Sequence, residues 1–228
     1  MKATLVSGAP NSGTIGTTNT QAVVDASFNA VRMSPKPYEF NSPSGPGGFY
    51  RLAVESVGAT VIASGGTIFS VRAPMSGLQF ILQRFLISAV VTTAFSAAQA
   101  LDYQIIRVDG FTAADTGGTT VAPLLTSNRM RTNMASSSAS SIQVSTTAAL
   151  GAGTGTSQSR AIGMGVVSQN NAVGSGGGMV TLFDNSQNGA HPAIFGPNEG
   201  FRVSPVTTMG STGVVNIYYV MEWLEALF

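Results

Sequence analysis

Hydrophobic and polar residues alternate along much of the chain from residue 49 onward, in short runs separated by turn-forming residues. The most regular run is VVNIYYVMEWLE, which places five apolar side chains on one side: Val215, Ile217, Tyr219, Met221 and Trp223. Its other side is more polar and carries Asn216, Tyr218 and Glu222. A period of two is typical of a β-strand buried on one face. The pattern predicts a core strand in which Trp223 packs, and an aromatic binding site at Trp223 is the alternative.

Three other runs show the same alternation over shorter lengths. Each sets apolar residues on one predicted face: Tyr50, Leu52 and Val54 in FYRLAVES, Phe69 and Val71 in TIFSVRAP, and Leu101, Tyr103 and Ile105 in LDYQIIRV. Pro74 ends the second run, because proline has no backbone N–H to donate to a sheet. We therefore expect three further core strands.

One run, GLQFILQRFLISAVV, is apolar on both sides. Simple alternation places Leu78, Phe80, Leu82, Leu86 and Val90 on one face, and Ile81, Phe85 and Ile87 on the other. A strand that is apolar on both faces is usually covered on both faces. We expect this strand to lie in the middle of a sheet.

The remaining strand signals are AIGMGVV, GMVTLF and GFRVSPV, and Gly210 to Gly213 are predicted to form the turn of a hairpin between the last two strands. Residues 109–160 are predicted to be long loops around short strands such as SIQVSTT. About eight to ten short strands without a convincing long helix indicate an all-β protein, an antiparallel β-sandwich of the jelly-roll type. A fully closed barrel is the alternative.

The first 48 residues differ from the rest, because they are dense in Gly, Pro, Ser and Thr. Within them QAVVDASFNAVR alternates weakly, as a strand or a short helix would. We expect residues 1–48 to form an extended arm, which orders only against a partner or its own domain, and residues 49–228 to form the sandwich. A frayed terminus is the alternative for the arm.

Charged residues make up only 9% of the 228 residues, against about 25% in an ordinary soluble domain. A surface of hydroxyls and small groups loses little free energy when another protein covers it. We interpret this surface as one built to be covered; the alternative is a secreted domain that stays soluble through neutral polar groups. The net charge of +1 and the scattered Lys and Arg residues argue against direct nucleic-acid binding. Cysteine is absent, which leaves the redox compartment undetermined.

No membrane contact or secretory signal is expected. Residues Phe85 to Leu101 carry no charge, but they fall short of the roughly 20 apolar residues that a membrane helix needs, and we interpret them as a strand and its turn. The start MKATLVSGAP lacks the apolar segment of a signal peptide.

The sequence predicts no catalytic, cofactor-binding or metal-binding residue. His191 is the single histidine, and a catalytic triad or zinc site needs partners that the chain scarcely holds. Asp115 to Gly118 resemble the Asp-Thr-Gly turn of aspartic proteases, which requires two carboxylates sharing a proton. A single copy could work only across a dimer axis, and Ala113 and Ala114 stand where that turn usually has other apolar residues, so we interpret the motif as an ordinary turn. The stretches GAGTGT and GSGGG complete neither a dinucleotide-binding motif nor a phosphate loop.

Two other groups of charged residues are candidates, one for calcium binding and one for contact with a neighbouring molecule. Asp109 and Asp115 lie six positions apart, a spacing that matches no calcium loop. Arg129 and Arg131 fall on one side of an extended segment and could pair with carboxylates of a neighbouring molecule. A pair of solvated arginines is the alternative.

Between about Thr67 and Glu225 the chain resembles a known group of proteins. The order of IFSVRAPMSG, ILQRFLISAVV, YQIIRVDGFTAADTGGT, STTAALGAGT, GPNEGFRV and VMEWLE is similar to that in structural proteins of tailed-bacteriophage virions. The resemblance implies a jelly-roll or β-sandwich fold, no catalytic residues, and capsid decoration, or cement, as the leading role. It also implies a homotrimer on the shell.

We therefore expect a non-enzymatic protein on the outer surface of the capsid, whose partners are the major capsid protein and its own copies. A neck, collar or tail structural protein with the same fold is one alternative. A receptor- or glycan-binding fibre module that uses the loops of residues 109–160 is another, and Phe111 is the one aromatic residue there.

Overall fold

The computed structural model describes residues 23–25, 30–32, 48–75, 77–122, 128–130, 135–169, 172–186 and 192–226, the first two ranges by their backbone alone. The chain divides into two compact units, Met1–Pro37 and Tyr38–Phe228. In the first, β1 (Val23–Asp25) pairs antiparallel with β2 (Ala30–Arg32). The described backbone of QAVVDASFNAVR is thus strand rather than helix. The arm formed by residues 1–48 stays a prediction.

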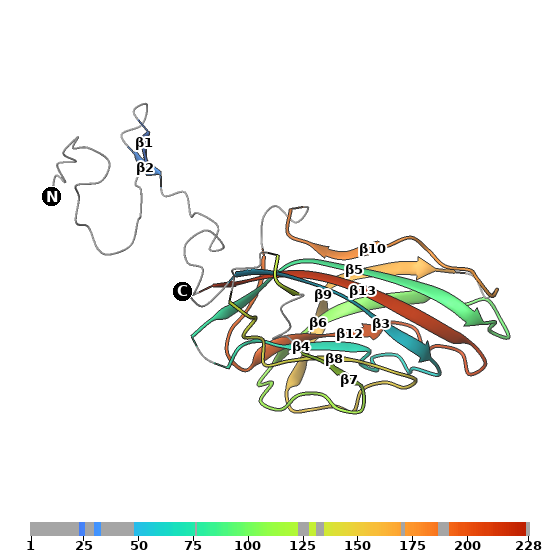
Figure 1. Cartoon of the computed structure of the whole chain (residues 1–228). Coiled ribbons are helices and arrows are strands. Elements are labelled where there is room, and N and C mark those ends of the chain that lie inside the picture. The colour runs from blue at the N-terminus through green and yellow to red at the C-terminus, as the bar shows by residue number, and fades with distance from the viewer. Residues whose placement is uncertain are drawn as a thin grey trace. The chain divides into compact units, whose positions relative to one another are not determined.

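The second unit consists of two antiparallel sheets packed face to face (Figure 1). The five-stranded sheet has the order β10–β5–β13–β3, with β11 beside β5, and its strands are β3 (Gly48–Ala59), β5 (Gln79–Thr93), β10 (Val180–Asp184), β11 (Ala193–Phe195) and β13 (Val214–Ala226). The six-stranded sheet has the order β7–β8–β4–β12–β6–β9, and its strands are β4 (Phe69–Arg72), β6 (Leu101–Asp109), β7 (Thr119–Val121), β8 (Ser141–Val144), β9 (Thr156–Ser168) and β12 (Glu199–Pro205). The expected all-β antiparallel sandwich is confirmed, and its jelly-roll character stays a prediction.

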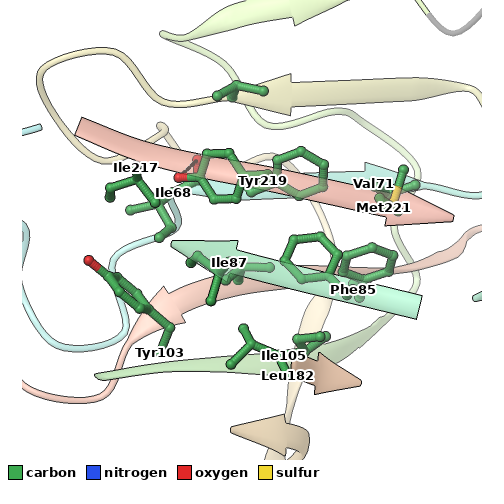
Figure 2. Close-up of a cluster of buried hydrophobic side chains, with 14 of the residues drawn as sticks. Ile68, Val71, Phe85, Ile87, Tyr103, Ile105, Leu182, Ile217, Tyr219 and Met221 are labelled. Atoms are coloured by element: carbon green, nitrogen blue, oxygen red, sulfur yellow. Dashed lines mark hydrogen bonds between the residues drawn. The ribbon is translucent and has the colours of Figure 1, made fainter. Parts of the chain in front are cut away.

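The core lies between the sheets, where the alternating residues predicted from β3, β4, β6 and β13 meet. Figure 2 shows residues of β4, β6 and β13 in this core. All five residues predicted for the inner side of β13 are buried in it. The indole of Trp223 lies between the rings of Tyr50 and Phe80, with centroid distances of 5.4 and 5.6 Å. Stacked aromatic pairs of this kind stabilise a core beyond their buried area. Trp223 is a core residue and not an exposed binding platform.

The faces predicted for β5 are partly wrong. Phe80 and Leu82 do face the core, but Phe85 and Ile87 also face it, whereas Leu86 lies on the outer side with Ile81. The pairing with β13 shifts by one residue between Leu82 and Arg84. Such a β-bulge inserts an extra residue and reverses the alternation beyond it.

The hairpin predicted through Gly210 to Gly213 is also wrong. β12 pairs with β4 and β6 in the six-stranded sheet, whereas β13 pairs with β3 and β5 in the five-stranded sheet. The connection between them therefore crosses from one sheet to the other. Turn-forming residues mark a reversal of direction, but they do not specify which strands pair afterwards.

Strand β9 approaches β10 closely along one side of the sandwich. A Cβ atom built on Gly163 would lie 1.9 Å from the carbonyl oxygen of Leu182, and one on Gly165 would lie 2.9 Å from a methyl carbon of Val180. Leu182 sits at the bulge where β10 shifts its pairing with β5. Glycine is thus needed at position 163, because the carbonyl occupies the space of any side chain.

We predict that Gly163→Ala destabilises the protein by about 1–3 kcal/mol, the usual cost of forcing an extra group into a packed interior. Gly178→Ala is the matched control, since a Cβ atom there meets nothing within 4 Å. Urea unfolding followed by circular dichroism measures both free energies. Equal stability of the two variants would contradict the close approach of β9 and β10.

Candidate contact surface

The most buried ion pair of the described residues joins Asp115 and Arg202. Arg202 donates from Nη2 to Asp115 Oδ1 at 2.7 Å and from Nε to Oδ2 at 2.9 Å, so the pair is bidentate. The backbone N–H of Gly153 donates to Asp115 at 2.7 Å. The guanidinium lies 4.9 Å from the centre of the Phe111 ring, and Phe111 is fully buried. Asp115 therefore fastens two loops to β12, and both of its oxygens are occupied.

Three more ion pairs or clusters bind most of the other described charges to one another. Arg107 contacts Glu199 at 2.7 Å and Asp109 at 3.1 Å. Burial lowers the pKa of Arg107, but the hydrogen bonds and charges of these two carboxylates leave it above its ordinary value. The others are Arg51 with Glu222 at 3.6 Å and Arg84 with Asp184 at 3.7 Å.

The last two pairs belong to a single row across the five-stranded sheet. Glu222 of β13 lies opposite Arg51 of β3 on one side and Arg84 of β5 on the other, and Arg84 lies opposite Asp184 of β10. The charges alternate in sign across four strands, which favours this register over a slipped one. This row organises the sheet and leaves little net charge on its outer face.

Glu225 is a buried carboxylate that the sequence analysis did not single out. It accepts hydrogen bonds from the Ser137 hydroxyl at 2.5 Å, the Ser138 backbone N–H at 2.8 Å and the Trp223 indole N–H at 3.0 Å. These donors come from β13 itself and from a segment 87 to 88 positions earlier in the chain. Nothing local in VMEWLEALF shows that the glutamate is buried.

Three tyrosines have perturbed hydroxyls inside the sandwich. Burial raises the pKa of Tyr50, Tyr103 and Tyr219 above the ordinary value, and the neighbouring Glu225 and Asp102 carboxylates add to the effect for Tyr50 and Tyr103 respectively. Tyr50 donates to the backbone oxygen of Ala135 at 3.1 Å. These hydroxyls stay protonated at neutral pH and act as packing groups rather than as acids or bases.

With most charges paired internally, the described surface exposes several large apolar side chains. They are Val57, Val61, Met75, Met130, Met164, Val166, Val173, Met179 and Val206. Met164 and Val166 are exposed by 65% and 49%, and both lie on the outer side of β9. Exposed methionines adapt their shape readily to a partner. The surface thus offers neutral and apolar groups that are cheap to desolvate.

The two sheets end in strands that carry unpaired charges. β9 pairs with β6 alone among the named strands, and β3 pairs with β13 alone. Arg160 on β9 and Glu55 on β3 are both exposed, and neither forms a hydrogen bond or an ion pair with another described residue. Each sheet thus ends in a strand that carries one free charge, of opposite sign to the other.

Of the other sequence candidates, two lie outside the described residues and two have partners of their own. His191 and Arg131 lie outside the described residues. Arg129 donates to the Ser136 hydroxyl at 2.6 Å, and Asp109 pairs with Arg107. Among the described residues, no group of three or more His, Asp or Glu side chains could hold a metal ion. No helix in the same ranges is long and apolar enough to cross a membrane.

Comparison with known proteins gives no assignment. No family model, no curated protein and no solved structure matches this chain. The candidate surface therefore has to be interpreted from its own residues.

Proposed function

We propose that the protein is a decoration (cement) protein of a tailed-bacteriophage capsid, which binds the outer surface of the head and ties neighbouring major capsid subunits together. The observation that carries the proposal is that nearly all described charged side chains are paired within the domain. Eight arginines and eight acids fall within residues 48–226. Arg131 lies outside the described residues, and all the others except Arg160 and Glu55 have a hydrogen-bond or ion-pair partner among the described residues of the domain. The remaining surface is hydroxylic, small or apolar.

Such a surface suits binding to other proteins more than chemistry. Covering hydroxyl, alanine and methionine groups strips no ion of its water, so many weak contacts can form at little cost. Copies arranged with the symmetry of the shell would make these contacts together, and avidity would turn weak single contacts into lasting attachment. A protein that binds only the assembled lattice stabilises that lattice.

The sequence resemblance supports a phage particle as the setting, and it supports the position on the head more weakly. The segments between Thr67 and Glu225 that resemble phage structural proteins coincide with the strands β4, β5, β6, β12 and β13 and with the loops that Asp115 fastens. The proposed partners are the major capsid protein and further copies of this chain as a homotrimer. The proposed mode of action is mechanical, without catalysis or a cofactor.

The receptor- or glycan-binding alternative is less well supported. Sugar recognition generally uses an exposed aromatic face, and Phe111 is the one aromatic residue in the loops of residues 109–160. Phe111 is buried under the guanidinium of Arg202 and so is closed to a ligand. These loops therefore lack the platform that this function would use.

The proposal is tested with purified heads that lack the protein. We expect the added chain to bind intact heads in hundreds of copies and to raise the temperature at which they release their genome. Bovine serum albumin at the same concentration is the control for nonspecific protection. Binding without a rise in that temperature, or no binding, would refute the proposal, and about a dozen copies per particle would favour the neck or tail.

A further inference from the structure

The two charges that lack a partner among the described residues lie on β3 and β9, each of which ends its sheet on one side. Glu55 lies within the exposed side of β3, next to Val57, which is 56% exposed. Arg160 lies in the part of β9 that is exposed on both faces, four positions before Met164. Each end strand therefore combines one unpaired charge with an exposed apolar side chain.

An end strand offers unpaired backbone groups to another chain, and natural proteins usually protect it with charges, proline or a covering segment. β9 has one charged residue in thirteen and no proline. β3 is covered near its two ends, where Met130 N–H donates to Phe49 and Thr60 N–H donates to Thr147. Between Arg51 and Val57, no backbone hydrogen bond reaches a described residue outside β13.

The opposite charges of Arg160 and Glu55 determine which strands of two copies can contact each other favourably. A contact between two β9 strands would place two arginines in one interface, and a contact between two β3 strands would place two glutamates there. Only the contact between unlike strands brings opposite charges together.

We propose that β9 of one copy packs along β3 of the next copy, with Arg160 facing Glu55. The apolar side chains Met164 and Val57 would lie in the same contact. The uncovered stretch of β3, from Arg51 to Val57, is about 23 Å long. With a sandwich about 20 Å thick, the contact would cover roughly 450 Å² on each partner, the size of a weak contact that gains strength when several form together.

This contact is head-to-tail, because it joins different surfaces of identical chains. Repeated contacts of this kind close into a ring when the rotation between copies allows it. The inference deepens the self-association in the proposed function and rests on it. The test of this contact uses the purified full chain without heads. If the chain does not self-associate, the contact is refuted, while binding to heads is still decided by its own experiment.

The experiment reverses the charges at positions 160 and 55 and measures self-association by sedimentation velocity and native mass spectrometry. We expect the unchanged chain to form a discrete oligomer that weakens as salt is raised. Arg160→Glu alone and Glu55→Arg alone should each weaken association by about tenfold or more, because each places like charges in every contact. The double variant, Arg160→Glu with Glu55→Arg, should restore association to within about threefold.

A mixture of the two single variants gives a second test. Each single variant should associate poorly alone, but the mixture contains contacts in which the charges are again opposite, so mixed oligomers should appear. A ring of three would keep one like-charged contact, so mixing should restore association less fully than the double variant does. Ser211→Glu, on an exposed connection outside both strands, is the control for added negative charge, and unchanged melting temperatures show that folding is intact. A monomeric unchanged chain, or an oligomer indifferent to both reversals, would overturn the proposal.

Discussion

Replacing Asp115 with alanine is expected to destabilise the protein by about 3–5 kcal/mol, the usual cost of leaving one partner of a buried ion pair without the other. Arg202 would keep its charge beneath the loops with neither of its two bonds to the carboxylate. Gly153 would also lose its acceptor, so that two loops would detach from β12 together. Chemical denaturation followed by circular dichroism gives the free energy of unfolding.

Two control variants separate charge from packing in this experiment. Asp109→Ala removes a carboxylate from a partly exposed pair and should cost less than about 1 kcal/mol. The double variant Asp115→Ala with Arg202→Met removes both charges and should recover most of the loss, because no ion is then left buried. If Asp115→Ala is no more harmful than Asp109→Ala, the loops are not fastened by this pair.

Trp223→Ala is expected to have a similarly large effect, about 3–5 kcal/mol, as for other buried large aromatics. Removing the indole would open a cavity between Tyr50 and Phe80, which it contacts on both faces. It would also take one hydrogen-bond donor from the buried carboxylate of Glu225. Thermal and urea unfolding monitored by circular dichroism measure the loss without relying on tryptophan fluorescence.

The two contributions of Trp223 are separated by Trp223→Phe. Phenylalanine keeps most of the ring packing but lacks the N–H donor, so its cost should be roughly 1–3 kcal/mol, as for the loss of one hydrogen bond to a charged group that keeps its other donors. A loss below about 1 kcal/mol in both variants would mean that Trp223 does not anchor the core.

The strands could be predicted where alternation is undisturbed. From Val215 to Trp223 in β13, and from Leu101 to Ile105 in β6, every second residue enters the core, because one face packs on the opposite sheet and hydrophobic burial enforces that side. In β5 the same argument fails beyond Leu82, because a single-residue bulge reverses the faces and leaves no mark in composition. The pairing of β13 with β3 and β5 likewise depends on the whole sheet and not on the turn that precedes it.

The contact surface was less predictable than the fold. The low charge content indicated a neutral surface, but the partners of the charges could not be foreseen. Asp115 meets Arg202 across 87 positions, and Glu225 meets Ser137 across 88. Such contacts are made by loops whose paths follow from packing and not from local periodicity. The motif AADTGG was therefore open to interpretation as a turn, although its aspartate proves to be a central fastening.

The position of β13 between β3 and β5 has a consequence for how the protein forms in the cell. The side chain of Asn216 accepts a bond from Gly58 across 158 positions, so the five-stranded sheet closes only after the ribosome has made nearly all of the domain. Sheets joined by such distant contacts form slowly. Until then β3 and β5 lack the strand that pairs with both of them, and aggregation competes with folding. The yield of usable protein will thus depend on synthesis rate and chaperones as much as on equilibrium stability.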